Sequence, residues 1–231
     1  MTGAVQAAEA AVPYQVRATR SIRLFAPGER GRRNRRSLDG LFLALAAVVC
    51  GFGAAAASQA PAEDARAARN VIAVLGWAEA LWRTAFVGLL VLAAIVLVGL
   101  VVRRRKFIGR DVATGLAVEL ALTVLLAHAV ESDWTPFASH LLSRWGFPEI
   151  RIASATTILI VAGPELVRPV RRAGTVLIVS AAIGSVALGA ALPSAALGGL
   201  ALGLGSAGIT RLIWGTAAGF ASAETIRTEL A

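Results

Sequence analysis

The sequence of 231 residues has very few of the side chains that bind metals or form crosslinks. It contains one cysteine, Cys50, and two histidines, His128 and His140. One cysteine excludes an intrachain disulfide and a cysteine-ligated cluster, and two histidines are too few for a histidine-rich metal site. The chain also lacks the CxxC, HExxH and GxxxxGK[ST] motifs of redox, zinc-protease and nucleotide-binding sites. We therefore expect no metal and no cofactor.

Charged residues are scarce as well, at 16% of the chain, and of 23 basic residues only Lys106 is a lysine. The arginine clusters lack the interleaved aromatic side chains that bind single-stranded nucleic acid, so no nucleic-acid partner is expected. The net charge of +9 instead indicates membrane topology and contact with anionic lipid headgroups. The preference for arginine and alanine suggests a GC-rich bacterial genome, which favours the bacterial cytoplasmic (inner) membrane.

Apolar residues make up 57% of the chain, against about 45–50% in an average soluble domain. They fall into blocks close to the length that a helix needs to cross the hydrocarbon core. Backbone groups find no water there, so spanning segments must be helices. The sequence therefore predicts an all-α integral, multi-pass membrane protein with six transmembrane helices, at residues 41–58, 85–102, 112–130, 152–167, 175–192 and 195–214.

Basic residues also predict the orientation. Six spans place both termini on one side, and 18 of the 23 Lys and Arg residues fall in segments on that side. The positive-inside rule then favours an N-in/C-in protein. We expect a basic cytoplasmic N-terminal tail at 1–37, the membrane domain at 38–214 and a cytoplasmic tail at 215–231. That last tail is typical of the start of a further helix, which leaves open a further domain.

Some features of the sequence have two interpretations. Residues 59–70 are expected to be a polar connector, and residues 71–82, with Trp77 and Trp82, an interfacial turn or helix. Glu119, inside the third span, is either part of a buried polar pair or a site residue. The small residues Gly199 and Gly203 form a GxxxG pattern that favours close helix packing, within the chain or with a partner.

One stretch near the C-terminus carries a longer pattern. Residues 184–199 read GSVALGAALPSAALGG, which resembles the third motif of the type 2 phosphatidic acid phosphatase (lipid phosphate phosphatase) superfamily, SRxxxxxHxxxD continuing as HYPSDVLGG. The motif's arginine falls on Ser185, its nucleophilic histidine on Ala191 and its aspartate on Ala195. The positions that match the motif are Leu188, Gly189, Pro193, Ser194, Leu197, Gly198 and Gly199.

The other two motifs of that family match less well. The second motif, PSGH, aligns with residues 148–151, where its serine and glycine fall on Glu149 and Ile150 and its general-acid histidine on Arg151. The first motif, KxxxxxxRP, fits best from His128 to residues 135–136, and only its proline is kept. The resemblance implies a six-helix, phosphatase-like bundle with all three motifs at one membrane face.

The departures from the motifs predict a protein without the family's activity. The resemblance implies attack on phosphorus by a histidine that an aspartate orients, while a second histidine protonates the leaving oxygen. Ala191 offers no nucleophile, Ala195 cannot orient one, and Arg151 stays protonated at pH 7. We expect no catalytic residues, and a domain that binds a lipid or lipid-linked headgroup or acts as a scaffold. The candidate lipid- or phosphate-binding residues are Arg151, His128, Glu149 and Ser185.

The expected partners are membrane lipids and another membrane protein or a second copy of the chain. Arg151 has two possible roles, since it lies near a helix N-terminus that favours anions and beside Glu149, with which it could pair. Two other functions stay open. One is an active lipid phosphatase with His128 or His140 as the nucleophile, and the other is a transporter or channel subunit that depends on Glu119.

Overall fold

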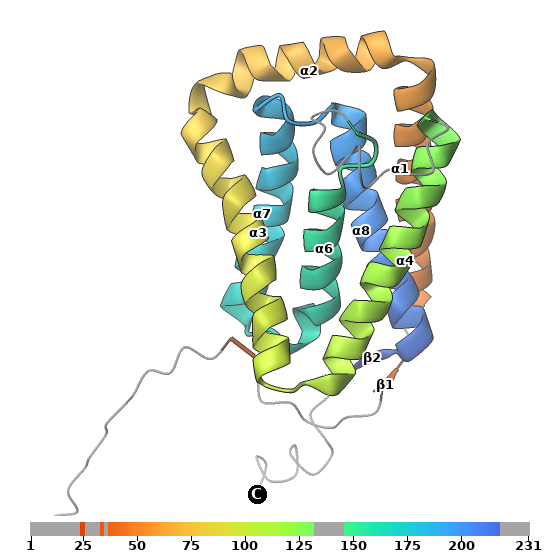
Figure 1. Ribbon diagram of the computed structural model, residues 1–231, viewed down its shortest axis with the longest axis vertical. Coiled ribbons are helices and arrows are strands. Elements are labelled where there is room, and N and C mark those ends of the chain that lie inside the picture. The colour runs from red at the N-terminus through yellow and green to blue at the C-terminus, as the bar shows by residue number, and fades with distance from the viewer. Residues whose placement is uncertain (1–23, 26–32, 35–36, 132–145, 218–231) are drawn as a thin grey trace, which may run out of the picture.

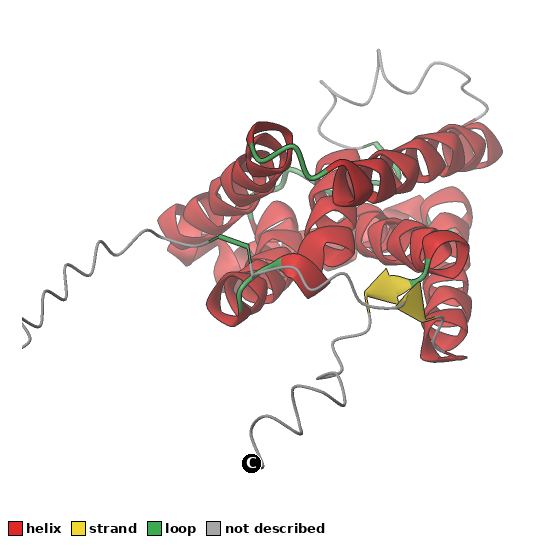
Figure 2. Cartoon of the chain, turned by 90° about the horizontal axis from the view of Figure 1, so that it is seen from below, coloured by secondary structure: helices red, strands yellow, loops and turns green. Residues whose placement is uncertain are grey.

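The computed structural model describes residues 24–25, 33–34, 37–131 and 146–217, and helices account for nearly all of them (Figure 1). Two strands of two residues each, β1 (Arg33–Asn34) and β2 (Thr216–Ala217), pair antiparallel beside the helices (Figure 2). The helices are α1 (Ser37–Gln59), α2 (Pro61–Leu75), η1 (Gly76–Ala78), α3 (Glu79–Val102), α4 (Lys106–Glu131), α6 (Ile150–Ala162), η2 (Gly163–Glu165), α7 (Arg168–Ala187) and α8 (Pro193–Trp214).

Five stretches among the described residues are long and apolar enough to cross a membrane. They are Asp39–Gln59, Pro61–Val102, Lys106–Val130, Arg168–Ala187 and Pro193–Trp214. Large apolar side chains are exposed on the outward faces of these helices, as at Phe42, Phe52, Val91 and Val179, and a hydrocarbon environment makes such exposure favourable. The chain is therefore an all-α, multi-pass membrane protein, as its composition predicts.

The helices form an upright bundle with α6 at its centre, and α2 lies across one end (Figure 1). We call this end the α2 end. At the opposite end α3 passes into α4 and α7 begins, and we call it the basic end for the arginines gathered there. The pairing of β1 with β2 brings the residues before α1 and after α8 together at the basic end, so the chain enters and leaves the bundle on one side.

The central helix α6 is shorter than the sequence predicts. It has 13 residues, about 20 Å of helix at 1.5 Å per residue, which is less than the roughly 30 Å of a hydrocarbon core. The helix stops at Ala162 because Gly163 and Pro164 follow within the apolar block, and the chain continues as η2. The predicted fourth span, residues 152–167, is thus divided between α6 and η2, and the count of six spans is not confirmed.

The core of the bundle forms where α6 meets α3 and α7. Its buried side chains include Leu89, Val96, Ile158, Leu159 and Ile178. Helix α6 contributes buried residues on most of its circumference, which is expected of a helix that neighbours surround. Among the upright helices that the structure describes, α6 is thus the shortest, and its neighbours enclose it.

Glycines let α8 approach α6 closely. A β-carbon at Gly199 would lie 2.5 Å from the carbonyl oxygen of Glu149, and one at Gly203 would lie 2.6 Å from that of Ala153. Real β-carbons do not approach backbone so closely, so only glycine fits at either position. The GxxxG pattern is therefore used for packing within the chain. The opposite side of α8 packs on α1, where Gly205 faces Ala46.

The segment before α3 also differs from the prediction. Residues 59–70 are not a connector, because a single helix, α2, runs from Pro61 to Leu75 and is followed by η1. Helix α3 begins at Glu79, before the predicted start at residue 85. Trp77 is 86% exposed, while the Trp82 indole donates a hydrogen bond to the Leu75 carbonyl at 2.8 Å. The indole thus fixes the corner between α2 and α3.

Candidate functional site

Two of the predicted site residues, Glu149 and Arg151, bind each other at the α2 end. The guanidinium donates from Nε to Glu149 Oε1 at 2.5 Å and from Nη2 to Oε2 at 3.0 Å. Its carbon lies 5.2 Å from the centre of the Phe86 ring. Both carboxylate oxygens are thus engaged by a planar fork, the strongest arrangement for such a pair. In the structure Arg151 therefore pairs with Glu149, which is one of its two expected roles. The positive charge of Arg151 is compensated by this pair.

The other two predicted residues are placed differently. Ser185 is fully buried in α7, and its hydroxyl donates to the Ala182 carbonyl at 2.8 Å. A serine that bonds to its own helix does not present its hydroxyl to a ligand. His128 lies in the last turn of α4, half-buried. His140, Thr135 and Pro136 lie outside the described residues.

The segments that resemble the second and third phosphatase motifs pack on each other. The Glu149 amide donates to the Ala195 carbonyl at 3.0 Å, and the Phe147 ring forms a buried cluster with Ala191 and Ala195. A β-carbon at Gly198 would lie 2.5 Å from that ring. Residues 193–194 form the first turn of α8, and Gly189 makes the turn before it with a φ of 65°.

Asp64 is a contact residue that sequence reasoning missed. This buried carboxylate of α2 accepts the Ser194 amide at 3.2 Å and also the Ser194 hydroxyl. Ser194 lies at the start of α8, where a negative side chain satisfies exposed amides and the helix dipole. The contact joins positions 130 residues apart. The amphipathic pattern of residues 61–75 could have indicated the helix, but nothing in it indicates the partner.

A groove of about 410 Å³ opens at the basic end, beside the turn from α3 to α4. Arg104 makes that turn with a φ of 49°, a left-handed conformation that is uncommon for a residue with a side chain. The side chains of Arg104 and Lys106 are exposed. The groove combines apolar and cationic residues, namely Leu100, Val101, Arg104, Arg105, Lys106 and Gly109.

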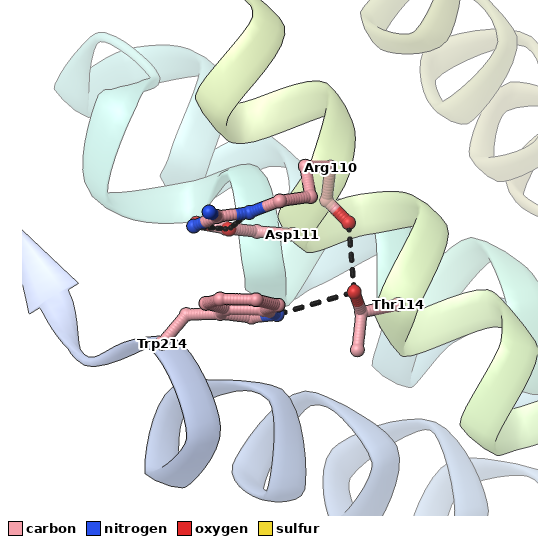
Figure 3. Close-up of polar contacts among 4 residues, drawn as sticks. All are labelled: Arg110, Asp111, Thr114 and Trp214. Carbon is pink, nitrogen blue, oxygen red and sulfur yellow. Dashed lines mark hydrogen bonds and ion pairs between the residues drawn. The ribbon is translucent and has the colours of Figure 1, made fainter.

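Neighbouring arginines are engaged with other groups. Arg105 pairs with Glu165 at 3.0 Å. Arg110 lies over the Trp214 ring, 3.6 Å from its centre, and pairs with Asp111 at 3.1 Å (Figure 3). The Trp214 indole donates to the Thr114 hydroxyl at 3.1 Å, which donates to the Arg110 carbonyl at 3.0 Å.

These contacts fasten the end of α8 to the first turns of α4. The side chains of Arg104 and Lys106, by contrast, form no hydrogen bond or ion pair with the part of the chain that the structure describes. Within that part, no group of three His, Cys, Asp or Glu side chains could hold a metal. The groove therefore combines two unpaired cationic side chains with apolar lining residues.

No family model matches the chain, and neither a curated protein nor a solved structure matches it. The resemblance to the lipid phosphate phosphatases therefore stays a prediction from the motif residues.

Proposed function

We propose that this chain is a non-catalytic, multi-pass membrane domain that binds the phosphate headgroups of anionic lipids in the groove at its basic end. The observation that carries the proposal is the unpaired charge of Arg104 and Lys106 in a groove with apolar walls. Arginine binds phosphate through a planar fork and lysine through a point charge. Together they suit a phosphodiester or phosphomonoester group.

The surroundings of the groove support a lipid rather than a soluble phosphate. Val101 lines the groove, and exposed Val98 and Val102 continue the same apolar face of α3. An acyl chain can follow that face while the headgroup lies at the turn. Each basic residue near an anionic membrane surface contributes about 1 kcal/mol, so two cations favour an anionic over a neutral lipid by roughly 25-fold.

The α2 end supports the same function less well. Arg151 is compensated by Glu149 and Ser185 bonds to its own helix, so a phosphate there would have to displace existing contacts. His128 would be the remaining predicted ligand. The absence of catalysis rests on Ala191 and Ala195, which are buried against Phe147 and carry no group able to attack phosphorus. A scaffold role with a membrane partner or second copy is compatible with this proposal.

Topology belongs to the proposal as well. We place the basic end in the cytoplasm of a bacterial cell and the bundle in its cytoplasmic membrane, with N-in/C-in orientation. The described arginines and lysine at the basic end outnumber those at the α2 end, which is the distribution that the positive-inside rule requires. Helix α6 with η2 would complete a sixth pass inside the bundle, shielded from lipid by its neighbours.

Binding of labelled phosphatidylglycerol and phosphatidylcholine to the purified protein in detergent tests the site. We expect preference for the anionic lipid. The double variant Arg104→Gln/Lys106→Gln should lose roughly 25-fold in affinity for it, at about fivefold per charge, with phosphatidylcholine binding unchanged.

A matched control removes the same charge from the opposite end. Arg66 and Arg83 are exposed residues of α2 and α3, and Arg66→Gln/Arg83→Gln should leave affinity within twofold of wild type. Equal losses in both double variants would contradict a localised site. The preparation should also release no inorganic phosphate from phosphatidic acid, and release that His128→Ala abolishes would instead establish a phosphatase.

A further inference from the structure

A carboxyl group is buried at mid-depth of the bundle. Glu119 lies at the middle of α4, which has 26 residues, roughly 18 Å from either helix end at 1.5 Å per residue. It is only 2% exposed. A carboxylate at this depth of a membrane is costly, and such groups are rare unless they bind an ion, a proton or a partner charge.

The neighbours of Glu119 are hydroxyl groups rather than cations. Ser154 of α6 donates to Glu119 Oε1 at 2.8 Å. The Thr157 hydroxyl, on the next turn of α6, also lies beside the carboxyl and close to the Gly203 carbonyl of α8 at 3.4 Å. Two hydroxyl groups of α6 thus lie beside the carboxyl, and the Gly203 carbonyl of α8 lies next to one of them.

Part of this oxygen set has no partner. Glu119 Oε2 makes no hydrogen bond with the described residues, and neither does the buried hydroxyl of Thr123, one turn further along α4. The buried hydroxyls of Thr156 and Ser206, on the two helices that pack against α4, are also unpartnered within the described chain. Unsatisfied polar atoms in a low-dielectric interior are expensive, so the unpartnered oxygen of Glu119 indicates that the carboxyl binds a proton or another cation.

The charged groups of the surrounding helices do not compensate Glu119. Arg151 of α6 points to Glu149 and Phe86, and Arg211 of α8 donates to the Ile160 carbonyl. The remaining described titratable side chains of α4 and of the helices packed on it are Lys106, Arg110, Asp111, His128, Asp39, Cys50, Glu79, Arg83 and Arg103. Except for Cys50 they lie within about two turns of a helix end, so the charge at Glu119 must be balanced locally.

We infer that Glu119, with the hydroxyls of Ser154 and Thr157, reversibly binds and releases one monovalent cation, H⁺ or Na⁺, within the membrane. One carboxylate balances one positive charge, whereas a divalent ion would leave a net charge in the hydrocarbon region. Hard cations take oxygen ligands of the kind gathered here. The site lies apart from the groove at the basic end, so it does not depend on the lipid-binding proposal.

Infrared difference spectroscopy of wild type against Glu119→Gln isolates the signal of this carboxyl. The protonated form and the carboxylate absorb at separate frequencies. The protein is titrated with NaCl at constant pH, and with choline chloride as the control. If only NaCl converts the signal of the protonated carboxyl into that of the carboxylate, the site binds Na⁺. A titration of pH without Na⁺ identifies a proton site if the conversion is the same with and without Na⁺.

Two further variants test the ligand set. Ser154→Ala should shift the midpoint of the conversion roughly tenfold in ion concentration, because it removes a hydrogen bond to a charged group. Thr84→Ala should not shift it, since the Thr84 hydroxyl is exposed and donates to the Ala80 carbonyl. A Glu119 signal that neither Na⁺ nor pH converts would overturn the inference and leave a permanently neutral structural carboxyl.

Discussion

At the residue scale, the ion pair of Glu149 with Arg151 is the most consequential polar contact at the α2 end. Glu149 is buried, and its side chain is 6% exposed against 33% for Arg151. Removing one partner of a buried pair leaves the other charge uncompensated, which costs more than the pair contributes.

We therefore expect Glu149→Gln to lower the free energy of unfolding by about 2–3 kcal/mol. This loss is smaller than that for breaking a fully buried pair, because the Arg151 side chain is partly exposed. The matched control is Glu79→Gln, since Glu79 pairs with Arg83 at 2.5 Å on an exposed surface. That change should cost less than about 0.5 kcal/mol. Unfolding in detergent measures the loss of stability in both variants. Equal losses would show that the Glu149 pair contributes no more to stability than an exposed pair does.

At the element scale, the contact between α8 and α6 depends on missing side chains. A β-carbon at Gly203 would meet the Ala153 carbonyl and the Thr156 side chain, with the latter's β-carbon 2.7 Å away. Both are on a helix that neighbours enclose, so neither can move far.

Gly203→Ala should destabilise the protein by about 1–3 kcal/mol, the usual cost of overpacking a core. Gly51→Ala, on α1, is the control, because a β-carbon there meets nothing within 4 Å. Alanine is a better helix former than glycine, so this control should be neutral or slightly stabilising. Thermal unfolding separates the two, and a stable Gly203→Ala protein would contradict the close approach of α8 to α6.

The same elements show where sequence reasoning succeeds and where it stops. Hydropathy predicts the long helices because each apolar block is nearly continuous. Hydropathy overestimates the length of α6 because Gly163 and Pro164, which end the helix, lie within such an apolar block. The Glu149–Arg151 pair is foreseeable since the two residues lie only two positions apart in the sequence. The Asp64–Ser194 contact is not, and the groove depends on the backbone of Arg104, which no local pattern specifies.

At the scale of the whole molecule, charge is distributed unevenly between the two ends. The described basic residues at the basic end are Arg33, Arg103, Arg104, Arg105, Lys106, Arg110, Arg168, Arg171, Arg172 and Arg211, against Arg66, Arg69, Arg83 and Arg151 at the α2 end. This asymmetry predicts which end faces the cytoplasm.

Single cysteines in a Cys50→Ala background test that orientation. The two variants are Trp77→Cys and Lys106→Cys. Trp77 is an exposed residue at the α2 end, and Lys106 is an exposed residue at the basic end. In intact cells a membrane-impermeant maleimide should label only Trp77→Cys, and after permeabilisation it should label both. Labelling of Lys106→Cys alone in intact cells would reverse the proposed topology.

Helix α2 sets a distance as well as covering an end. Its 15 residues hold the last turn of α1 and the first turn of α3 roughly 22 Å apart at 1.5 Å per residue, and the Asp64–Ser194 contact fixes its position between them. Helices α7 and α8 lie beneath that interval (Figure 1). The length of α2 therefore determines the separation of α1 and α3 at this end of the bundle. Deleting one helical turn would draw α1 and α3 together by about 5 Å and leave too little room for the helices between them.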